Sequence, residues 1–312
     1  MNLKGQSFFS HEKWVAHLCL LGSALLMGSA YVGAKLALQG VGPLSTAFLR
    51  FFIACIITWP VLFLTHGIQP IRKEHIIYFI GHGLFQTTIY FSLQYVGLRY
   101  TTANNTALIV NTRPIFLALL AVIFFKERFS LIQWLAFFLS FCGVMVILYD
   151  PAATYMPGHL FGDFLIVLNA LSGALGVLFG KRLLKEYKPF TILVYQITIG
   201  ALGLLPLALI ESGGQIALGQ VAWGPIIFLA VFSTAIAQSL FNWGLSKLSV
   251  SSTAIYFFIV PAANLVLAHF VFGEPVTLAL LIGGSLIITG MYVINYRKRN
   301  VNQSELINET YE

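Results

Sequence analysis

Arg113 is the residue of this chain whose type and position point most directly to chemistry. It lies in the apolar stretch 102–125, roughly 16 Å deep if that stretch is a membrane helix with a rise of about 1.5 Å per residue. An arginine at that depth costs about 2.5–3.5 kcal/mol, so it must face the protein interior and find a partner. No Asp or Glu lies at a similar depth. The partner is an anionic substrate group, backbone carbonyls freed by nearby prolines, or water in a cavity.

A second set of polar side chains recurs at every fourth position in the stretch 75–97. Side chains four apart share one face of a helix, so the set forms a polar stripe. Such a stripe in a membrane helix lines a cavity or bonds a neighbouring helix. We predict a role in substrate binding, with helix bonding as the alternative, and His82 could also carry a proton. The polar stripe consists of His82, Gln86, Tyr90 and Gln94.

Four residues of the second half of the chain complete the predicted substrate site. Gln238 and Asn242 lie in the stretch 222–245, which is the counterpart of 75–97 in an internal repeat. Tyr256 and Asn264 flank a proline in the stretch 250–272. An aromatic ring in this place could stack on a planar substrate group or hold a cation. Packing against neighbouring helices is the alternative for all four.

Pro114 and Pro261 fall in the middle of two apolar stretches. A proline inside a helix removes one backbone hydrogen bond and clashes with the preceding turn. The paired prolines therefore predict kinks or hinges beside the substrate site, with static kinks that serve packing as the alternative.

Four other charged residues near the ends of apolar stretches have structural explanations. Lys35 and Arg50 are expected to snorkel to the lipid headgroups, although Arg50 is deep enough to line an outer vestibule. Glu127 and Glu274 are expected to stabilise basic neighbours or the N-terminus of a helix rather than to act as coupling sites.

No arrangement typical of an enzyme or a metal protein occurs in the sequence. The HExxH and GxSxG motifs are absent, no two carboxylates pair deep in an apolar stretch, and the three cysteines form no CxxC pair. We therefore expect no catalysis, no cofactor and no bound metal. The net charge of +7 is not gathered in a polar domain, so we expect no nucleic-acid partner.

Membrane helices are the elements that must position these residues. Of the 312 residues, 58% are hydrophobic and only 9% are charged, whereas soluble domains carry about 25% charged residues. A bilayer core of about 30 Å takes roughly 20 apolar residues per helix. We predict ten spans near 14–37, 44–65, 75–97, 102–125, 130–149, 159–181, 190–210, 222–245, 250–272 and 276–296.

Lys and Arg are distributed unequally between the two sides of these spans. With the N-terminus inside, 14 of the 18 Lys and Arg residues fall in inside segments, and only Arg99 falls in an outside loop. Positive residues collect on the cytoplasmic side. We therefore expect a multi-pass protein of the inner (plasma) membrane with both termini in the cytoplasm.

The sequence repeats itself with an offset of 147 residues. Residues 97–147 align without gaps with 244–294, and the register extends back through Thr87 and Thr234. Each copy holds five spans, an odd number, so the second copy must be inverted in the membrane. The rare residue types that match include Gly97/Gly244, Thr106/Thr253, Pro114/Pro261, Glu127/Glu274 and Gly143/Gly290.

The predicted fold is thus an all-α integral membrane protein of ten transmembrane helices in two inverted five-helix repeats. The predicted parts are a cytoplasmic segment at 1–13, the first repeat at 14–149, the second repeat at 159–296 and a cytoplasmic tail at 297–312.

Several short motifs occur in a characteristic order along the chain. They are GSAYVGAK at 28–35, FLRFF at 48–52, the two mid-helix prolines, and the helix ends FFKE and VFGE. In this the chain resembles the EamA-type family of the drug/metabolite transporter superfamily over about 14–296. The resemblance implies a ten-helix bundle with a central cavity. It also implies export of amino acids and other metabolites, or their import in some intracellular bacteria. Arg113 departs from the resemblance, because an apolar residue is expected directly before that proline.

Together, the residues and the resemblance predict a permease that works by alternating access. Its substrate would be a small metabolite, most simply an amino acid or related carboxylate, moved outward across the inner membrane. The partners would be this substrate and the lipid bilayer, and a homodimer stays open. The alternatives are import of a nucleotide- or cofactor-like metabolite, efflux of lipophilic drugs, and a non-transporting membrane assembly protein.

Overall fold

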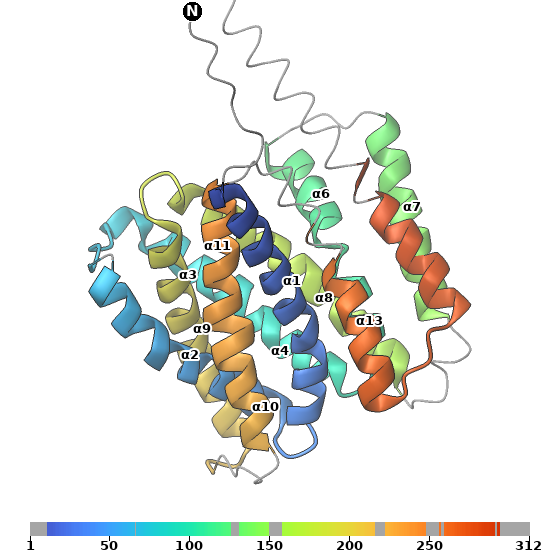
Figure 1. Cartoon of the computed structure of the whole chain (residues 1–312), viewed down its shortest axis with the longest axis horizontal. Helices are drawn as coiled ribbons and strands as arrows, with labels where there is room; N and C mark the ends of the chain where they lie inside the picture. The colour runs from blue at the N-terminus through green and yellow to red at the C-terminus, as the bar shows by residue number, and fades with distance from the viewer. Residues whose placement is uncertain are drawn as a thin grey trace, which may run out of the picture.

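The computed structural model describes residues 11–65, 67–125, 131–149, 158–215, 222–247, 256, 259–290 and 292–293. Within these ranges the chain forms helices and no strand, which confirms the prediction of an all-α fold. Short turns join the helices (Figure 1). In chain order they are α1 (His11–Ala37), α2 (Pro43–Thr65), η1 (Lys73–His75), α3 (Ile76–Gly83), η2 (Leu84–Thr88), α4 (Ile89–Leu98), α5 (Ala103–Val110), α6 (Arg113–Phe125), α7 (Leu131–Leu148), α8 (His159–Leu183), α9 (Pro189–Glu211), α10 (Trp223–Phe228), η5 (Leu229–Ile236), α11 (Ala237–Lys247) and α13 (Ile259–Phe272).

Seven helical segments of the described chain are long and apolar enough to cross a membrane. Their bounds follow seven of the predicted spans closely, because runs of apolar residues end where polar or Gly/Pro residues begin. Shorter apolar helices occupy the other three predicted spans, so a total of ten crossings stays a prediction. The seven are Glu12–Ala37, Pro43–Thr65, Lys73–Leu98, Ala103–Phe124, His159–Leu183, Pro189–Glu211 and Trp223–Phe241, and the shorter ones are Trp134–Ile147, Ile259–Phe272 and Leu278–Gly290.

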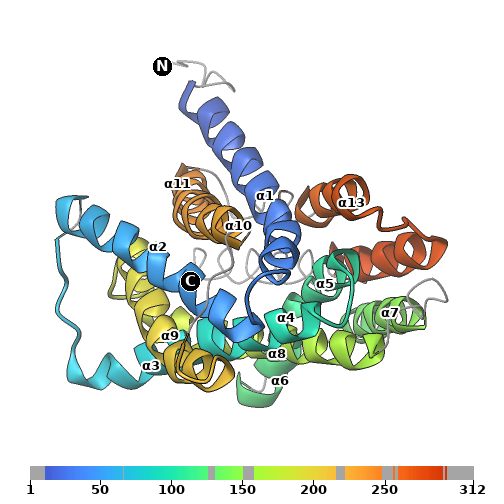
Figure 2. The same cartoon turned by 90° about the horizontal axis from the view of Figure 1, so that it is seen from below.

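The helices pack in pairs that bring distant parts of the chain together. α1 lies between α11 and α13, α2 packs along α9, and α4 packs along α8 (Figures 1 and 2). At one edge, α7 lies beside the helix Leu278–Gly290 (Figure 1). Gly143 permits this contact, since a Cβ atom there would stand 2.6 Å from the carbonyl oxygen of Gly283.

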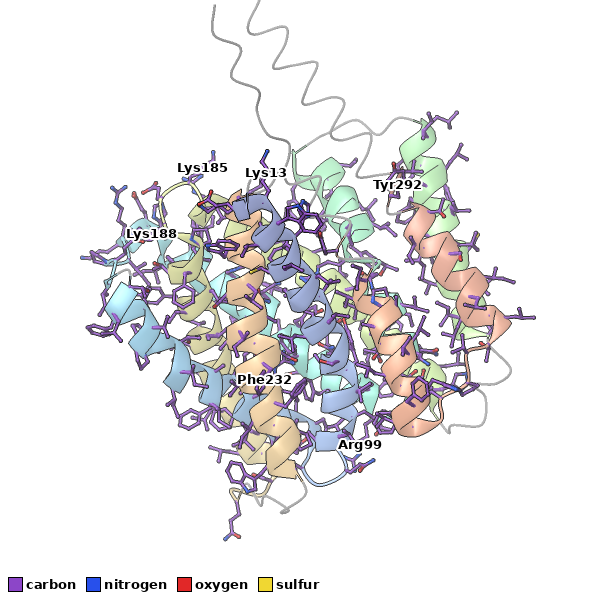
Figure 3. All side chains as sticks on the ribbon, in the orientation of Figure 1. Lys13, Arg99, Lys185, Lys188, Phe232 and Tyr292 are labelled. Carbon is purple, nitrogen blue, oxygen red and sulfur yellow. The ribbon has the colours of Figure 1, made fainter. Side chains whose placement is uncertain are left out.

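The two ends of the bundle differ in their charged side chains. Lys13, Lys185 and Lys188 lie at the end from which the N-terminus leaves, and Arg99 lies at the opposite end (Figure 3). The four residues come from α1, the turn after α8, and the turn after α4. The three lysines thus lie at the end that the sequence assigns to the inside, and Arg99 lies at the end that it assigns to the outside.

Two π-helices stand at equivalent positions of the sequence repeat. η2, shifted by 147 residues, falls inside η5. Each π-helix contacts a carbonyl of a long neighbouring helix. Ser233 donates to the oxygen of Leu26 at 2.9 Å, and the Gln86 amide nitrogen, in the orientation that satisfies its neighbours, donates to the oxygen of Gly173 at 3.0 Å. Both partners are 147 positions apart, so the same contact occurs twice.

The fourth apolar stretch is broken into α5 and α6 by a tight turn. The amides of Asn111 and Thr112 donate to carbonyls three positions back, at 3.1 and 2.9 Å, which is tighter than an α-helical turn. Arg113 is the first residue of α6 and Pro114 the second. A proline in the first turn lacks only an N–H that would have no partner there. Pro261 lies in α13, three residues into its described part. At Pro114 the structure thus has a break in place of the predicted kink.

Glu274 caps the N-terminus of α5. Its carboxylate accepts from the amides of Ala103 and Asn104 at 3.0 and 3.1 Å, and from Lys35 Nζ at 2.7 Å. A carboxylate at a helix N-terminus is stabilising, and this is the structural role expected for Glu274. Because Lys35 forms its ion pair with a side chain that is only 6% exposed, the prediction that Lys35 snorkels to the headgroups is wrong. Glu127 lies outside the described residues.

Candidate functional site

Arg113 is held by neutral side chains. Its guanidinium carbon lies 5.2 Å from the centre of the Tyr90 ring, and its Nη1 donates to the Gln86 amide oxygen at 2.9 Å. In the part of the chain that the structure describes, no Asp or Glu forms an ion pair with Arg113. The positive charge is therefore available to an anion from outside the protein. Three predicted site residues, Arg113, Gln86 and Tyr90, come together here.

The polar stripe packs against a row of glycines on α8. Gly173 faces Tyr90, Gly176 faces Gln86, and Gly180 faces His82, and in each case an added Cβ would come within 3.0 Å of the opposing side chain. His82 bonds the carbonyl oxygen of Gly176 through Nδ1 at 2.8 Å. Helix-to-helix bonding, one of the two predicted alternatives, therefore describes His82.

Gln94, the last member of the polar stripe, lies near the other end of α4. Its side chain is buried, and its amide oxygen has no hydrogen-bond partner among the described residues. The stripe thus divides into a packed part at His82, a part that contacts Arg113, and a buried amide at Gln94.

Arg50 is a second arginine of the bundle interior, and it is more deeply buried than Arg113. Its side chain is only 6% exposed. Its Nε donates to Thr234 Oγ1 at 2.9 Å, its Nη1 donates to the Tyr95 hydroxyl at 3.2 Å, and its guanidinium stacks over Phe91 at 4.9 Å. Because Arg50 reaches into the bundle, the prediction that it snorkels to the headgroups is wrong. Like Arg113, it forms no ion pair with any carboxylate in the described ranges.

Tyr31 of α1 lies near both arginines. It is buried and interacts electrostatically with Arg50, Arg113 and Tyr90. The sequence places Tyr31 in the GSAYVGAK motif, but only the packing of α1 against the rest of the bundle brings it near both arginines. We call Arg50, Arg113 and Tyr31 the two-arginine site.

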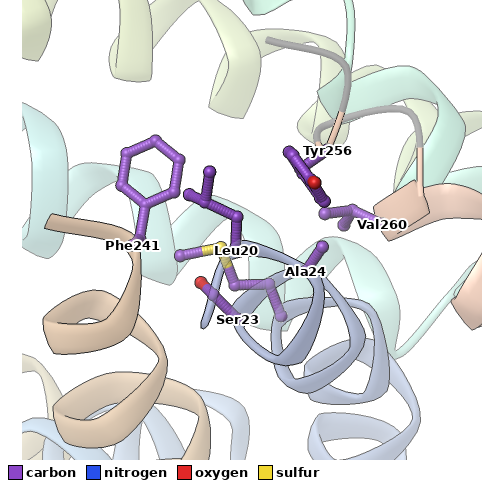
Figure 4. Close-up of a pocket in the computed structure, with 7 residues that line it drawn as sticks. Leu20, Ser23, Ala24, Phe241, Tyr256 and Val260 are labelled. Carbon is purple, nitrogen blue, oxygen red and sulfur yellow. The ribbon is translucent and has the colours of Figure 1, made fainter. Parts of the chain in front are cut away.

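A small apolar pocket of about 10 Å³, room for roughly one water molecule, opens between α1, α11 and α13. Leu20, Ala24 and Met27 of α1 line it, and their spacing puts them on the helix face that also carries Tyr31. Figure 4 shows Phe241 on one side of Leu20, with Tyr256 and Val260 on the other. The remaining lining residue is Ser23, whose hydroxyl donates to the carbonyl oxygen of Ala237. The pocket and the two-arginine site therefore follow one another along a single face of α1.

Val260 and Arg113 occupy equivalent positions of the 147-residue repeat. In one half this position carries the guanidinium that rests on Tyr90, and in the other it carries a valine beside the pocket. Tyr256, a predicted site residue, lines the pocket and bonds His17 Nδ1 through its hydroxyl at 2.7 Å.

Among the described residues, neither Asn264 nor Gln238 forms a hydrogen bond with Arg50 or Arg113. Asn264 is fully buried and donates from Nδ2 to the Oδ1 of Asn104 at 3.0 Å. Gln238 is partly buried in α11. Asn242 belongs to the same helix, but its side chain lies outside the described residues. Among the described side chains, the structure therefore gathers Arg113, Gln86 and Tyr90 in one place and places Tyr256 beside the pocket.

Metal ligands do not cluster in the described part of the chain. No group of three or more His, Cys, Asp or Glu side chains there could hold a metal ion. The chemistry that the two-arginine site offers is the binding of an anion by hydrogen bonds from guanidinium groups.

Known proteins similar to this chain are transporters by name. An uncharacterized transporter of Bacillus subtilis, YyaM, is 28% identical over 93% of this chain and 98% of its own length. An uncharacterized transporter of Archaeoglobus fulgidus is 29% identical over 87% of this chain and 93% of its own length. A solved crystal structure shares the fold, with a TM-score of 0.61 and 16% identity over 92% of this chain and 98% of the other. The model of the EamA-like transporter family matches twice, over residues 14–149 and 160–296. The chain therefore belongs to the EamA-like transporter family.

Proposed function

We propose that this transporter moves a small anionic or zwitterionic metabolite, most simply an amino acid or related carboxylate, without transforming it. The observation that carries the proposal is Arg113, a deep arginine whose partners, Gln86 and Tyr90, are neutral. A buried positive charge is stabilised by an opposite charge with good hydrogen-bond geometry. A carboxylate supplies both, since it accepts two parallel hydrogen bonds from one guanidinium.

Alternating access is the mechanism we propose, between two inverted five-helix halves at 14–149 and 159–296. Two similar halves of opposite orientation have two similar energy minima, one open to each side. The contacts that recur 147 positions apart support this arrangement: Ser233 on Leu26 and Gln86 on Gly173. Ten helical segments at the predicted places support it as well.

The substrate path would run along the face of α1 that carries Leu20, Ala24, Met27 and Tyr31. The pocket lies beside the first three of these residues, and the two-arginine site lies at Tyr31. We propose the inner membrane as the location, with both termini in the cytoplasm and efflux as the direction. The lysines at the N-terminal end of the bundle support this orientation (Figure 3).

The thermal stability of the purified protein in detergent tests the proposal. A ligand that binds the folded state raises the melting temperature by mass action. The panel holds amino acids, dicarboxylates, nucleotides and lipophilic cations, and the variants are Arg113→Gln and, as a matched control, Arg99→Gln in an exposed turn.

Stabilisation by carboxylates in the wild type and in Arg99→Gln, but not in Arg113→Gln, is the result we expect. Stabilisation by lipophilic cations that is unchanged in Arg113→Gln would contradict the proposal and favour drug efflux. Stabilisation by no member of the panel would contradict it too, and would favour a non-transporting role.

A further inference from the structure

Most N–H donors of the two-arginine site have no acceptor among the described residues. A guanidinium carries five N–H donors. Arg50 uses two of its donors, on Thr234 and Tyr95, and Arg113 uses one, on Gln86. Within the described ranges the other donors of both groups have no acceptor, and the acceptors that are present are neutral.

The charges of the site are also unbalanced. Arg50 is almost fully buried, and Arg113 is partly buried among helices that are apolar enough to cross a membrane. Two like charges repel each other more strongly in a low-dielectric interior than in water. The two guanidinium groups rest on the neighbouring rings of Phe91 and Tyr90, which contact each other, so they lie in the same region of the bundle. One negative charge would leave one arginine uncompensated, whereas two would balance the site.

Aromatic rings fix the positions of the two guanidinium groups. Arg113 rests on Tyr90 and Arg50 rests on Phe91, and the two ring centres are 4.8 Å apart in an edge-to-face contact. Phe51 contacts Phe91 in the same way at 4.5 Å and also lies under Arg50. The rings hold the cations by cation–π attraction and displace water, which strengthens the field on a bound anion.

The two π-helices provide the anchors for this arrangement. Thr234 of η5 accepts from Arg50, and Gln86 of η2 accepts from Arg113. π-Helices occur frequently at functional sites, because the extra residue re-aims the side chains around it. Equivalent elements of the two halves thus each position one positive charge.

We propose that the two-arginine site takes a small organic dianion, either a dicarboxylate or a phosphate monoester, whose negative charge is divided between Arg50 and Arg113. This inference rests on the proposed transport of an anionic metabolite and narrows its substrate class. The Tyr31 hydroxyl, near both arginines, donates a hydrogen bond to the bound anion. The organic part of the substrate lies against the aromatic rings.

Matched ligand pairs test the charge requirement on the intact, purified protein. Succinate and its monoamide, succinamate, have the same length and differ by one negative charge. Glycerol phosphate and its methyl diester form the second pair. The dissociation constants are measured by titration calorimetry for the wild type, Arg50→Gln, Arg50→Lys and the control Arg99→Gln.

We expect the wild type and Arg99→Gln to bind a dianion about 10- to 100-fold more tightly than the matched monoanion. Arg50→Gln should reduce that preference to near unity, and Arg50→Lys, which keeps the charge, should retain part of it. Preference within the succinate pair identifies a dicarboxylate substrate, and preference within the glycerol phosphate pair identifies a phosphate monoester.

Equal binding of both members of each pair by the wild type overturns the dianion inference, and this comparison needs no variant to fold. If the monoanions bind and their binding depends on Arg113, the proposed function stands without the dianion. If no anion binds the wild type, the proposed function fails together with the inference.

Discussion

Arg50 of α2 and Thr234 of η5 are joined by a hydrogen bond from Nε to Oγ1 at 2.9 Å, across 184 positions of the chain. Thr234 belongs to a π-helix of the second matched segment, and Arg50 belongs to the first. A relative movement of the two segments would therefore change the position of this arginine. The hydrogen bond between Arg50 and Thr234 would therefore differ between a state open to one side of the membrane and a state open to the other.

Replacing Thr234 by valine should weaken anion binding without unfolding the protein. The change keeps the shape of the side chain and removes the acceptor for Arg50 Nε, a hydrogen bond to a charged group worth roughly 1.5–3 kcal/mol. We expect the dissociation constant of the bound anion to rise about tenfold or more, measured by titration calorimetry. Thr234→Ser keeps the hydroxyl and should bind like the wild type. Equal affinity in Thr234→Val would show that the anchor does not matter.

Gly176→Ala should destabilise the protein. A Cβ atom at Gly176 would stand 2.7 Å from a terminal atom of the Gln86 side-chain amide and 2.9 Å from the Cβ and backbone nitrogen of Gln86, so α8 and η2 must separate. Overpacking of this kind costs roughly 1–3 kcal/mol. Gly224→Ala is the matched control, because nothing lies within 4 Å of its added Cβ. A melting temperature of Gly176→Ala no lower than that of Gly224→Ala would refute the tight contact.

Glu274→Gln should cost more stability than Glu211→Gln. Both carboxylates cap a helix, since Glu211 accepts from the amides of Leu44 and Ser45 at the start of α2. Glu274 is buried and paired with Lys35, so removal of its charge leaves a partly buried ammonium without its partner. We expect a loss of roughly 1–3 kcal/mol at Glu274 and about 0.3–1 kcal/mol at the exposed Glu211. Unfolding in denaturant measures both, and the reverse order would contradict the assignment.

Ala24→Leu should slow transport, at some cost in stability because Ala24 is buried and the pocket beside it is small. Ala24 lines the pocket on the α1 face that leads to Tyr31, and a leucine there occupies part of the space. We expect transport to fall roughly tenfold, since misfit of a few methyl groups is worth about 1–3 kcal/mol. Leu25→Ala, a change on the exposed side of α1, is the control. Unchanged transport by Ala24→Leu would exclude the pocket from the substrate path.

The sequence predicts the helices well because the order of apolar and polar residues along the chain marks where each helix begins and ends. Apolar runs of helix length end at polar, glycine or proline residues, and the observed bounds lie close to the predicted ones. The sequence also predicts that Gln86 and Tyr90 share one helix face, because they lie four residues apart, but it does not predict their contact with Arg113. Their glycine partners on α8 could not be read from the stripe itself.

Arg50 and Tyr31 could not be placed from the sequence. Depth along a helix follows from residue number, but the direction in which a side chain faces follows from packing. α2 turns Arg50 toward η5 and Tyr95, away from the lipid headgroups. The π-helices and the break after α5 also escape prediction, because an extra residue in a helical turn leaves no distinct pattern of apolar residues. The signal that could have found Arg50 is its position within a long apolar helix, where a charge needs a partner.

Uptake by reconstituted proteoliposomes tests the central claim most directly. Labelled amino acids, dicarboxylates and phosphate esters are offered to vesicles that contain the wild type, Arg113→Gln or Arg99→Gln, with protein-free vesicles as the blank. The account predicts uptake of at least one anion by the wild type and Arg99→Gln, and a loss of about tenfold or more in Arg113→Gln. Uptake of no anion above the blank, or equal uptake by Arg113→Gln and the wild type, would contradict it.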